Sequence, residues 1–146
     1  RAIERLKVMS SLSASVPPQA ALSDYLAQGG YDLHLRRLRQ TLALQRDVMI
    51  DAIAESFPAG TRVTRPQGGY FLWLELAPHI DALALMRQAL PAGVSLMPGQ
   101  LFSADQRFAH CIRLNFAAAP AHDITRATHV LGGLVRGMDA GSQKGG

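Results

Sequence analysis

Residues 111–116, Cys111-Ile112-Arg113-Leu114-Asn115-Phe116, form a mostly apolar run that predicts a buried strand. The arginine in this run keeps its charge, so it needs a specific anionic partner inside the protein. A planar guanidinium presents paired N–H donors that match a carboxylate, which makes Arg113 a candidate carboxylate-binding residue. The alternative is a structural ion pair, for example with Glu75, and the sequence alone leaves both interpretations open.

The chain before this strand also has strand-like periodicity. Residues 61–65 are short and β-branched, residues 66–69 have turn chemistry, and residues 70–76 form an aromatic and aliphatic run. This pattern predicts an antiparallel hairpin. A further brief strand is expected over residues 94–97, and a Pro-Gly turn leads from it into a loop.

Helical periodicity dominates the first part of the chain. Two short helices are expected before residue 29, and the second is expected to begin near Pro18. A long amphipathic helix follows, with apolar residues at three- and four-residue spacing, Asp32 as its expected N-cap and Pro58 just beyond its end.

Two more helices complete the predicted pattern. Asp81 is expected to cap one that contains Leu83 and Leu90, and Pro120 is expected to open the last one. Residues 139–146 are expected to fray. The order of elements predicts an α+β fold, a mostly antiparallel sheet with helices packed on one face.

Composition limits the class of protein. With 146 residues, of which 48% are hydrophobic, the chain suits one domain or one domain plus part of another. No apolar run reaches the roughly 20 residues needed to cross a bilayer, and residues 1–7 lack the apolar block of a signal peptide. The expected location is therefore the cytoplasm. The lone Cys111 excludes an internal disulfide.

The charged residues suggest no second type of site. The net charge is +4, and Arg36, Arg37 and Arg39 cluster on the long predicted helix. Such a face can bind nucleic acid, but this one lacks interleaved aromatic residues, so we interpret it as a solvated face. The five histidines do not have metal-ligand spacing, and the sequence contains neither a phosphate-binding loop nor a Gly-x-Ser-x-Gly motif.

Three segments taken together resemble the C-terminal part of fold type I pyridoxal-phosphate (PLP) enzymes of the aminotransferase class I/II kind. These segments are residues 66–74, 95–102 and 111–117. Residues 28–39 add to the resemblance, which covers almost all of residues 1–138. The chain is most similar to GntR family regulators of the MocR type, in which a winged helix-turn-helix precedes an aminotransferase-like domain. Two features indicate this subfamily. They are the sequence Gly-Gly-Tyr-Asp-Leu-His-Leu-Arg-Arg-Leu-Arg at residues 29–39 and the Phe-Ser-Ala turn at residues 102–104.

The resemblance implies a domain plan. Residues 1–35 are expected to be the C-terminal remnant of the large PLP-binding domain, with the start of the long connecting helix. Residues 36–138 are expected to form the aminotransferase-like small domain of fold type I transferases, and residues 139–146 a flexible tail. The chain is therefore expected to be a C-terminal fragment of a longer protein.

The resemblance also implies site residues. Arg113 is expected to bind the α-carboxylate of an amino-acid ligand, and Phe71, Gly69, Pro98 and Gly99 are expected to line the pocket. Phe71 has an equally open interpretation as a core aromatic residue.

No catalytic residue is expected in this chain. The family's Schiff-base lysine, its acidic residue facing the pyridine nitrogen and its phosphate-binding groups are expected upstream, and neither Lys7 nor Lys144 fits the role of that lysine. The fragment alone is therefore not expected to transaminate.

For the full-length protein the resemblance implies PLP, an amino-acid or amine effector, DNA binding through an N-terminal domain, and a homodimer. Two alternatives remain open at this point. One is a fragment of a stand-alone class I/II aminotransferase with Arg113 in the same role. The other is a small α+β interaction module that uses the Arg-rich helix.

Overall fold

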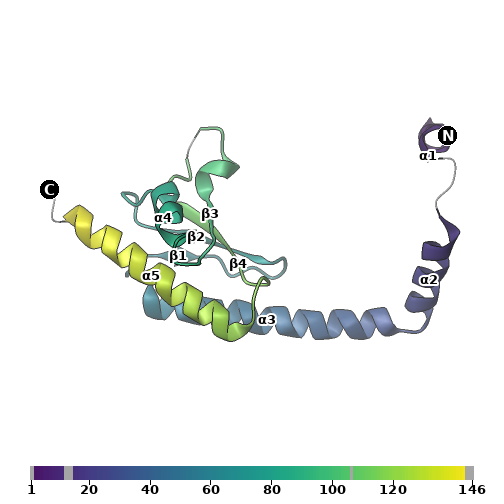
Figure 1. Cartoon of the computed structure of the whole chain (residues 1–146), viewed down its shortest axis with the longest axis horizontal. Helices are drawn as coiled ribbons and strands as arrows, with labels where there is room; N and C mark the ends of the chain where they lie inside the picture. Colours follow the sequence, from purple (N-terminus) through teal and green to yellow (C-terminus); the bar gives the residue numbers. More distant parts are fainter. Residues whose placement is uncertain (1, 12–14, 106, 144–146) are drawn as a thin grey trace. The chain divides into compact units, whose positions relative to one another are not determined.

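The computed structural model describes residues 2–11, 15–105 and 107–143, and the chain divides into two compact units, Arg1–Gln40 and Thr41–Gly146 (Figure 1). The division falls inside a long helix, five residues after the expected domain boundary at residue 35. That boundary, as a border between a large and a small domain, stays a prediction.

The first unit contains only helices among its described residues. They are α1 (Ala2–Ser11), α2 (Val16–Ala27) and the beginning of α3 (Gly30–Ser56). Helix α2 begins two residues before the expected Pro18, because prolines are tolerated in a first helical turn. Helix α3 begins at Gly30, so the prediction of Asp32 as its N-cap is wrong. Asp32 lies in the first turn, where the negative charge interacts favourably with the positive end of the helix dipole.

The second unit is built on one antiparallel sheet of order β1-β2-β4-β3. Its strands are β1 (Arg62–Val63), β2 (Phe71–Glu75), β3 (Met97–Pro98) and β4 (Cys111–Asn115). Strands β1 and β2 pair antiparallel, which confirms the predicted hairpin.

The predicted strand over residues 94–97 is wrong except at its last residue. Val94 N–H donates to the Ala89 carbonyl at 3.0 Å and so ends the preceding helix, and pairing with β4 begins only at Met97. The side chains of Val94 and Leu96 are buried, which explains the apolar pattern without a strand. Pro98 lies in β3 rather than in a loop, and Gly99–Phe102 form the short 3-10 helix η1.

The two remaining helices begin as expected. Helix α4 (Ala82–Ala89) has Asp81 as its N-cap, whose carboxylate accepts from Leu83 N–H at 3.0 Å. Helix α5 (Ala121–Gln143) follows Pro120 and extends to Gln143, and the flexible tail expected from residue 139 stays a prediction. Asp139 pairs with His79 at 2.8 Å, a tertiary contact that supports the last turns. Residues 144–146 lie outside the described residues.

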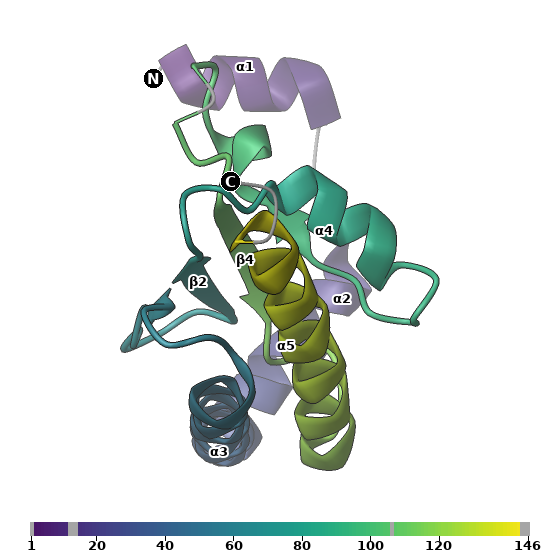
Figure 2. The same ribbon diagram turned by 90° about the vertical axis from the view of Figure 1, so that its left-hand side faces the viewer.

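One face of the sheet carries the hydrophobic core. Leu72, Leu74, Ile112 and Leu114 are at most 5% exposed and pack with apolar residues of α3, α4 and α5. Figure 2 shows α5 beside α3 and α4 over this face. Helices α3 and α5 approach closely at Gly132, where an added Cβ would lie 2.7 Å from the Ser56 hydroxyl. The arrangement confirms an α+β fold with helices on one face of the sheet.

The described part of the chain contains no helix that is long and apolar enough to cross a bilayer. Arg36, Arg37 and Arg39 are exposed on α3, as a solvated helix face requires.

Candidate functional site

Arg113 lies in the middle of β4, on the sheet face opposite the core. It pairs across the sheet with Trp73 of β2 on one side and Met97 of β3 on the other. Because side chains alternate along a strand, the buried neighbours Ile112 and Leu114 point into the core while Arg113 points away from it. The half-buried guanidinium therefore belongs to a second, more open face.

The alternative interpretation, a structural ion pair between Arg113 and Glu75, is wrong. The register places Glu75 opposite Cys111 of β4 and opposite Arg62 of β1, so it is a diagonal neighbour of Arg113. Its carboxylate lies 3.4 Å from Arg62 Nη1 and 3.7 Å from His110 Nε2. Within residues 2–11, 15–105 and 107–143, no carboxylate oxygen lies within 4 Å of the Arg113 guanidinium.

Two aromatic rings hold the guanidinium instead. Arg113 Cζ lies 4.1 Å from the centroid of the Phe71 ring and 4.7 Å from that of Phe102. Both distances are within the range of cation–π attraction. Trp73 contacts Phe102 and Phe108 edge to face, with centroid distances of 5.7 Å and 5.4 Å. We call these residues, Phe71, Trp73, Phe102, Phe108 and Arg113, the aromatic face.

The segment that carries Phe102 is fastened at its base. A Cβ at Gly99 would lie 2.8 Å from Phe108 Cβ and 2.9 Å from the Cys111 carbonyl oxygen, so only glycine permits this close packing. Gln100 Nε2 donates to the Asp81 carboxylate at 2.8 Å and to the Ala109 carbonyl at 3.2 Å. Helix η1 is thereby connected both to the start of α4 and to the chain just before β4.

The turn that carries Phe71 is fastened by α3. Gly69 has a φ of +82°, a conformation that favours glycine, and it brings the chain into β2 two residues before Phe71. Arg46 Nη1 donates to the Pro66 carbonyl at 3.2 Å and thus ties the turn to α3.

The structure brings some of the expected pocket residues together and separates others. Phe71 contacts Arg113 directly, Gly69 shapes the turn before it, and Gly99 supports the segment of Phe102. Pro98 is fully buried and pairs with Ile112, so it lies on the core side and does not line the aromatic face.

Trp73 and Phe102 lie in the segments 66–74 and 95–102 that the sequence analysis singled out, but it assigned neither them nor Phe108 to the surroundings of Arg113. Phe71 and Trp73 are two positions apart, so they lie on the same face of β2. This spacing could have predicted that Trp73 lies beside Phe71. No local pattern identifies Phe102 or Phe108.

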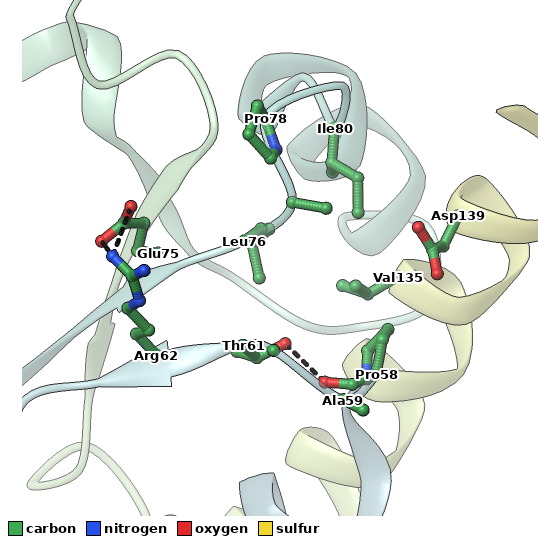
Figure 3. A pocket seen from close by; sticks show the side chains of 12 residues that line it. Pro58, Ala59, Thr61, Arg62, Glu75, Leu76, Pro78, Ile80, Val135 and Asp139 are labelled. Atoms are coloured by element: carbon green, nitrogen blue, oxygen red, sulfur yellow. Dashed lines mark hydrogen bonds and ion pairs between the residues drawn. The ribbon is translucent and has the colours of Figure 1, made fainter.

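Two hollows lie elsewhere in the second unit. The first has a volume of about 300 Å³ and is formed by the α3–β1 turn, the β2–α4 connection and α5. Figure 3 shows Arg62 and Glu75, which are paired with each other, on one side of it and Asp139 on the other. The second, of about 230 Å³, is mostly apolar and lies between α3, the turn after α4 and α5. Neither is lined by Arg113.

Two titratable groups in β4 and in the segment before it have shifted pKa values. Burial and the nearby Glu75 charge raise the pKa of the Cys111 thiol, which keeps it protonated. Hydrogen bonds from Ser103 and Arg107 lower the pKa of Asp105, which also pairs with Arg107 Nε at 2.7 Å. The Asp105 carboxylate therefore bonds to residues within two positions of it in the chain.

The described residues do not assemble a metal or PLP site. No three of their His, Cys, Asp and Glu side chains lie close enough together to hold a metal ion. Lys7 is exposed on α1, no lysine lines either hollow, and Lys144 lies outside the described residues. PLP chemistry uses a lysine that forms the Schiff base and an acidic residue at the pyridine nitrogen, so we assign none of the described residues to that cofactor.

Comparison with known proteins gives a consistent family. The model of aminotransferase class I and II matches residues 2–131. An uncharacterized HTH-type transcriptional regulator of Escherichia coli (strain K12), YdcR, is 40% identical over 93% of this chain, which corresponds to 29% of YdcR. Aromatic-amino-acid aminotransferase 1 of Thermococcus litoralis is 31% identical over 85% of this chain and 30% of its own length.

A solved structure matches both units. The chain resembles LysN, the α-aminoadipate aminotransferase of Thermus thermophilus, crystallised with N-(5'-phosphopyridoxyl)-L-leucine. The TM-score is 0.80 at 29% identity, over 93% of this chain and 35% of LysN. The chain thus spans about a third or less of the proteins it matches.

Proposed function

The chain belongs to the aminotransferase class I and II family, and we propose that it is the C-terminal part of a MocR-type transcriptional regulator. In this proposal the full-length protein is a cytoplasmic homodimer. Its aminotransferase-like domain binds PLP and an amino-acid or amine effector, and a separate N-terminal domain binds DNA. The similarity to YdcR supports the regulator, and the fold shared with LysN supports the ligand class.

The observation that carries the ligand-binding part of this proposal is the state of Arg113. A permanently charged, half-buried guanidinium has no acidic partner among the described residues. The Phe71 and Phe102 ring centroids lie 4.1 Å and 4.7 Å from its Cζ, and its N–H donors make no hydrogen bond within that part of the chain. Burying an unpaired charge is costly, so an external anion is the expected partner. A carboxylate fits best because its two oxygens match two parallel N–H donors.

We propose that Arg113 also links ligand occupancy to conformation. If the small domain closes on the remainder of the protein, Arg113 contacts the carboxylate only in the closed state. A ligand shifts an equilibrium by its difference in affinity for the two states, so this one contact biases the protein toward closure. PLP would be held by parts of the longer protein outside this chain, and the contact between Arg113 and the carboxylate does not involve PLP.

The test is calorimetry on the full-length protein with L-leucine and with 3-methylbutylamine, which is leucine without its carboxyl group. Arg113→Ala should weaken L-leucine binding by about 2–5 kcal/mol, because it removes one partner of a charged hydrogen-bonded pair. Arg62→Ala is the matched control, since Arg62 lies in the same sheet but is largely exposed and already paired with Glu75. Unchanged affinity for L-leucine in Arg113→Ala would contradict the proposal.

A stand-alone aminotransferase is the second candidate, favoured by the 31% identity to the Thermococcus litoralis enzyme. Arg113 has the same role in both candidates, so the distinction depends on the rest of the protein. Amino-group transfer to a 2-oxo acid without specific DNA binding in a gel-shift assay would establish the enzyme. Specific DNA binding that changes with the amino acid would establish the regulator.

A further inference from the structure

We propose that Phe102 is a positioning residue for the ligand carboxylate: together with Phe71 it holds the Arg113 guanidinium in the orientation that receives the acid group. The inference rests on the proposed function, because it assumes that Arg113 binds a carboxylate. It adds a residue from a different segment of the chain, and it identifies ring contacts as the means by which the arginine is held.

The first support is what holds Arg113. None of the hydrogen bonds or ion pairs among the described residues involves its guanidinium, whereas two rings lie within 5 Å of Cζ. A side chain with this many rotatable bonds samples several rotamers unless neighbours restrict it. Contact with the Phe71 and Phe102 rings is therefore what restricts the rotamers of Arg113.

The second support is the direction that stacking imposes. The five N–H donors of a guanidinium lie in its plane, whereas aromatic rings contact its faces. The Phe71 and Phe102 centroids lie 4.1 Å and 4.7 Å from Arg113 Cζ. Rings held against the faces at such distances would exclude water from above the plane and leave the N–H edges for a ligand. A carboxylate must then approach edge-on, which is the geometry of a two-bond pair.

The third support is the anchoring of Phe102 itself. Its ring is 44% exposed, so burial alone does not hold it in place. Trp73 contacts it edge to face, and Gln100, two residues earlier, is bonded to the N-cap of α4. Phe102 is thus held from β2 and from α4, and its position is fixed relative to β4.

The test compares Phe102→Leu with Phe102→Tyr in the full-length protein. Leucine keeps the apolar volume but removes the ring, whereas tyrosine keeps the ring. Phe102→Leu should weaken L-leucine binding about tenfold and leave 3-methylbutylamine binding within about twofold, because only the carboxylate uses Arg113. Phe102→Tyr should bind L-leucine like the wild type.

Phe108→Leu is the matched control. Phe108 also contacts Trp73 and is similarly exposed, but it does not contact the guanidinium. This variant should leave the affinity ratio between L-leucine and the amine unchanged. An equal loss in Phe108→Leu and Phe102→Leu would overturn the positioning role in favour of general loosening of the loop.

A second measurement does not depend on the ligand. Phenylglyoxal modifies accessible arginines, and the extent at Arg113 can be read by peptide mass spectrometry. Phe102→Leu should make this modification several-fold faster, and an unchanged rate would overturn the inference. If the wild type does not distinguish L-leucine from the amine, the carboxylate-binding role proposed for Arg113 fails, and this inference fails together with that role. If Arg113→Ala abolishes that distinction and Phe102→Leu does not, only the inference fails.

Discussion

The two faces of the sheet are built from alternate residues of the same strands, yet they differ in almost every physical property. On the core face, Leu72 and Ile112 are completely buried under three helices. On the aromatic face, Phe71 is 40% exposed and the neighbouring Arg113 carries a charge without an acidic partner among the described residues. Successive residues of β4 thus alternate between the buried core and the aromatic face, where the proposed carboxylate-binding residue lies.

This difference explains how one short strand can serve both purposes. A strand that is apolar on one side is held rigidly by the core, and its other side inherits that rigidity. The guanidinium of Arg113 is therefore presented from a fixed backbone, and only its side chain has to be restrained by rings.

The largest expected effect on stability comes from Ile112, one residue from Arg113. Ile112→Ala should lower the free energy of unfolding by about 2–5 kcal/mol, because it leaves a cavity in a fully packed core. Arg113→Ala, its counterpart on the other face, should change it by less than about 1 kcal/mol, because the loss of two ring contacts is offset by removal of an unpaired, half-buried charge. Urea unfolding of the full-length protein measures both. Similar losses in the two variants would remove the distinction between the faces.

The next effect concerns the helices that cover the core face. Gly132→Ala should destabilise by about 1–3 kcal/mol, since the new Cβ meets Ser56 and forces α3 and α5 apart. Gly133→Ala is the control, because nothing lies within 4 Å of a Cβ at that position. It should be neutral or slightly stabilising, since alanine favours a helix more than glycine does. The reverse order of the two melting temperatures would contradict the packing described here.

A smaller effect is expected at Asp81, which caps α4 on the core face and also accepts a hydrogen bond from Gln100 in the segment that carries Phe102. Asp81→Ala should cost about 1 kcal/mol through loss of the α4 N-cap. It also removes the hydrogen bond from Gln100, so L-leucine binding should weaken as well. Asp81→Asn, which keeps a capping oxygen, should preserve most of the stability. A variant that loses stability without any change in binding would show that η1 does not depend on this anchor.

The smallest effect is a pH dependence at Asp47, the partner of the Arg46 that ties the turn before Phe71 to α3. A hydrogen bond from Arg46, Nε to Oδ1 at 2.9 Å, lowers the pKa of the Asp47 carboxyl. A lowered folded-state pKa stabilises the protein above the unfolded value, near 3.9, and this contribution is lost as the pH falls through the folded value. The stability difference between wild type and Asp47→Asn should be constant above about pH 5 and shrink below about pH 4. A difference that is independent of pH would show that the pair contributes nothing.

Local patterns predicted most of the fold. The apolar runs at residues 70–76 and 111–116 predicted two strands, and the turn residues at 66–69 predicted the hairpin of β1 and β2. Asp81 and Pro120 correctly predicted where α4 and α5 begin. The features that these patterns missed have tertiary causes. Val94 and Leu96 are apolar because they enter the core, not because they pair in a sheet. The end of α5 is supported by His79, which lies sixty residues earlier in the chain.

The candidate site was only half predictable. A charge inside an apolar strand identified Arg113, but its partner depended on strand register, which pairs Glu75 with Arg62 instead. Register is set by contacts between distant residues, so residue types alone could not decide it. Phe102 and Phe108 come from an irregular segment whose aromatic residues have no periodicity. Only the folded chain places them beside β4.

The central claim is tested most directly by a crystal structure of the full-length protein with L-leucine. We expect both carboxylate oxygens to accept hydrogen bonds from the in-plane N–H groups of Arg113, at about 2.7–2.9 Å, with the rings of Phe71 and Phe102 still stacked on the guanidinium. An aspartate or glutamate of the protein bound to Arg113, with leucine absent from it, would show that the charge serves the fold and not a ligand.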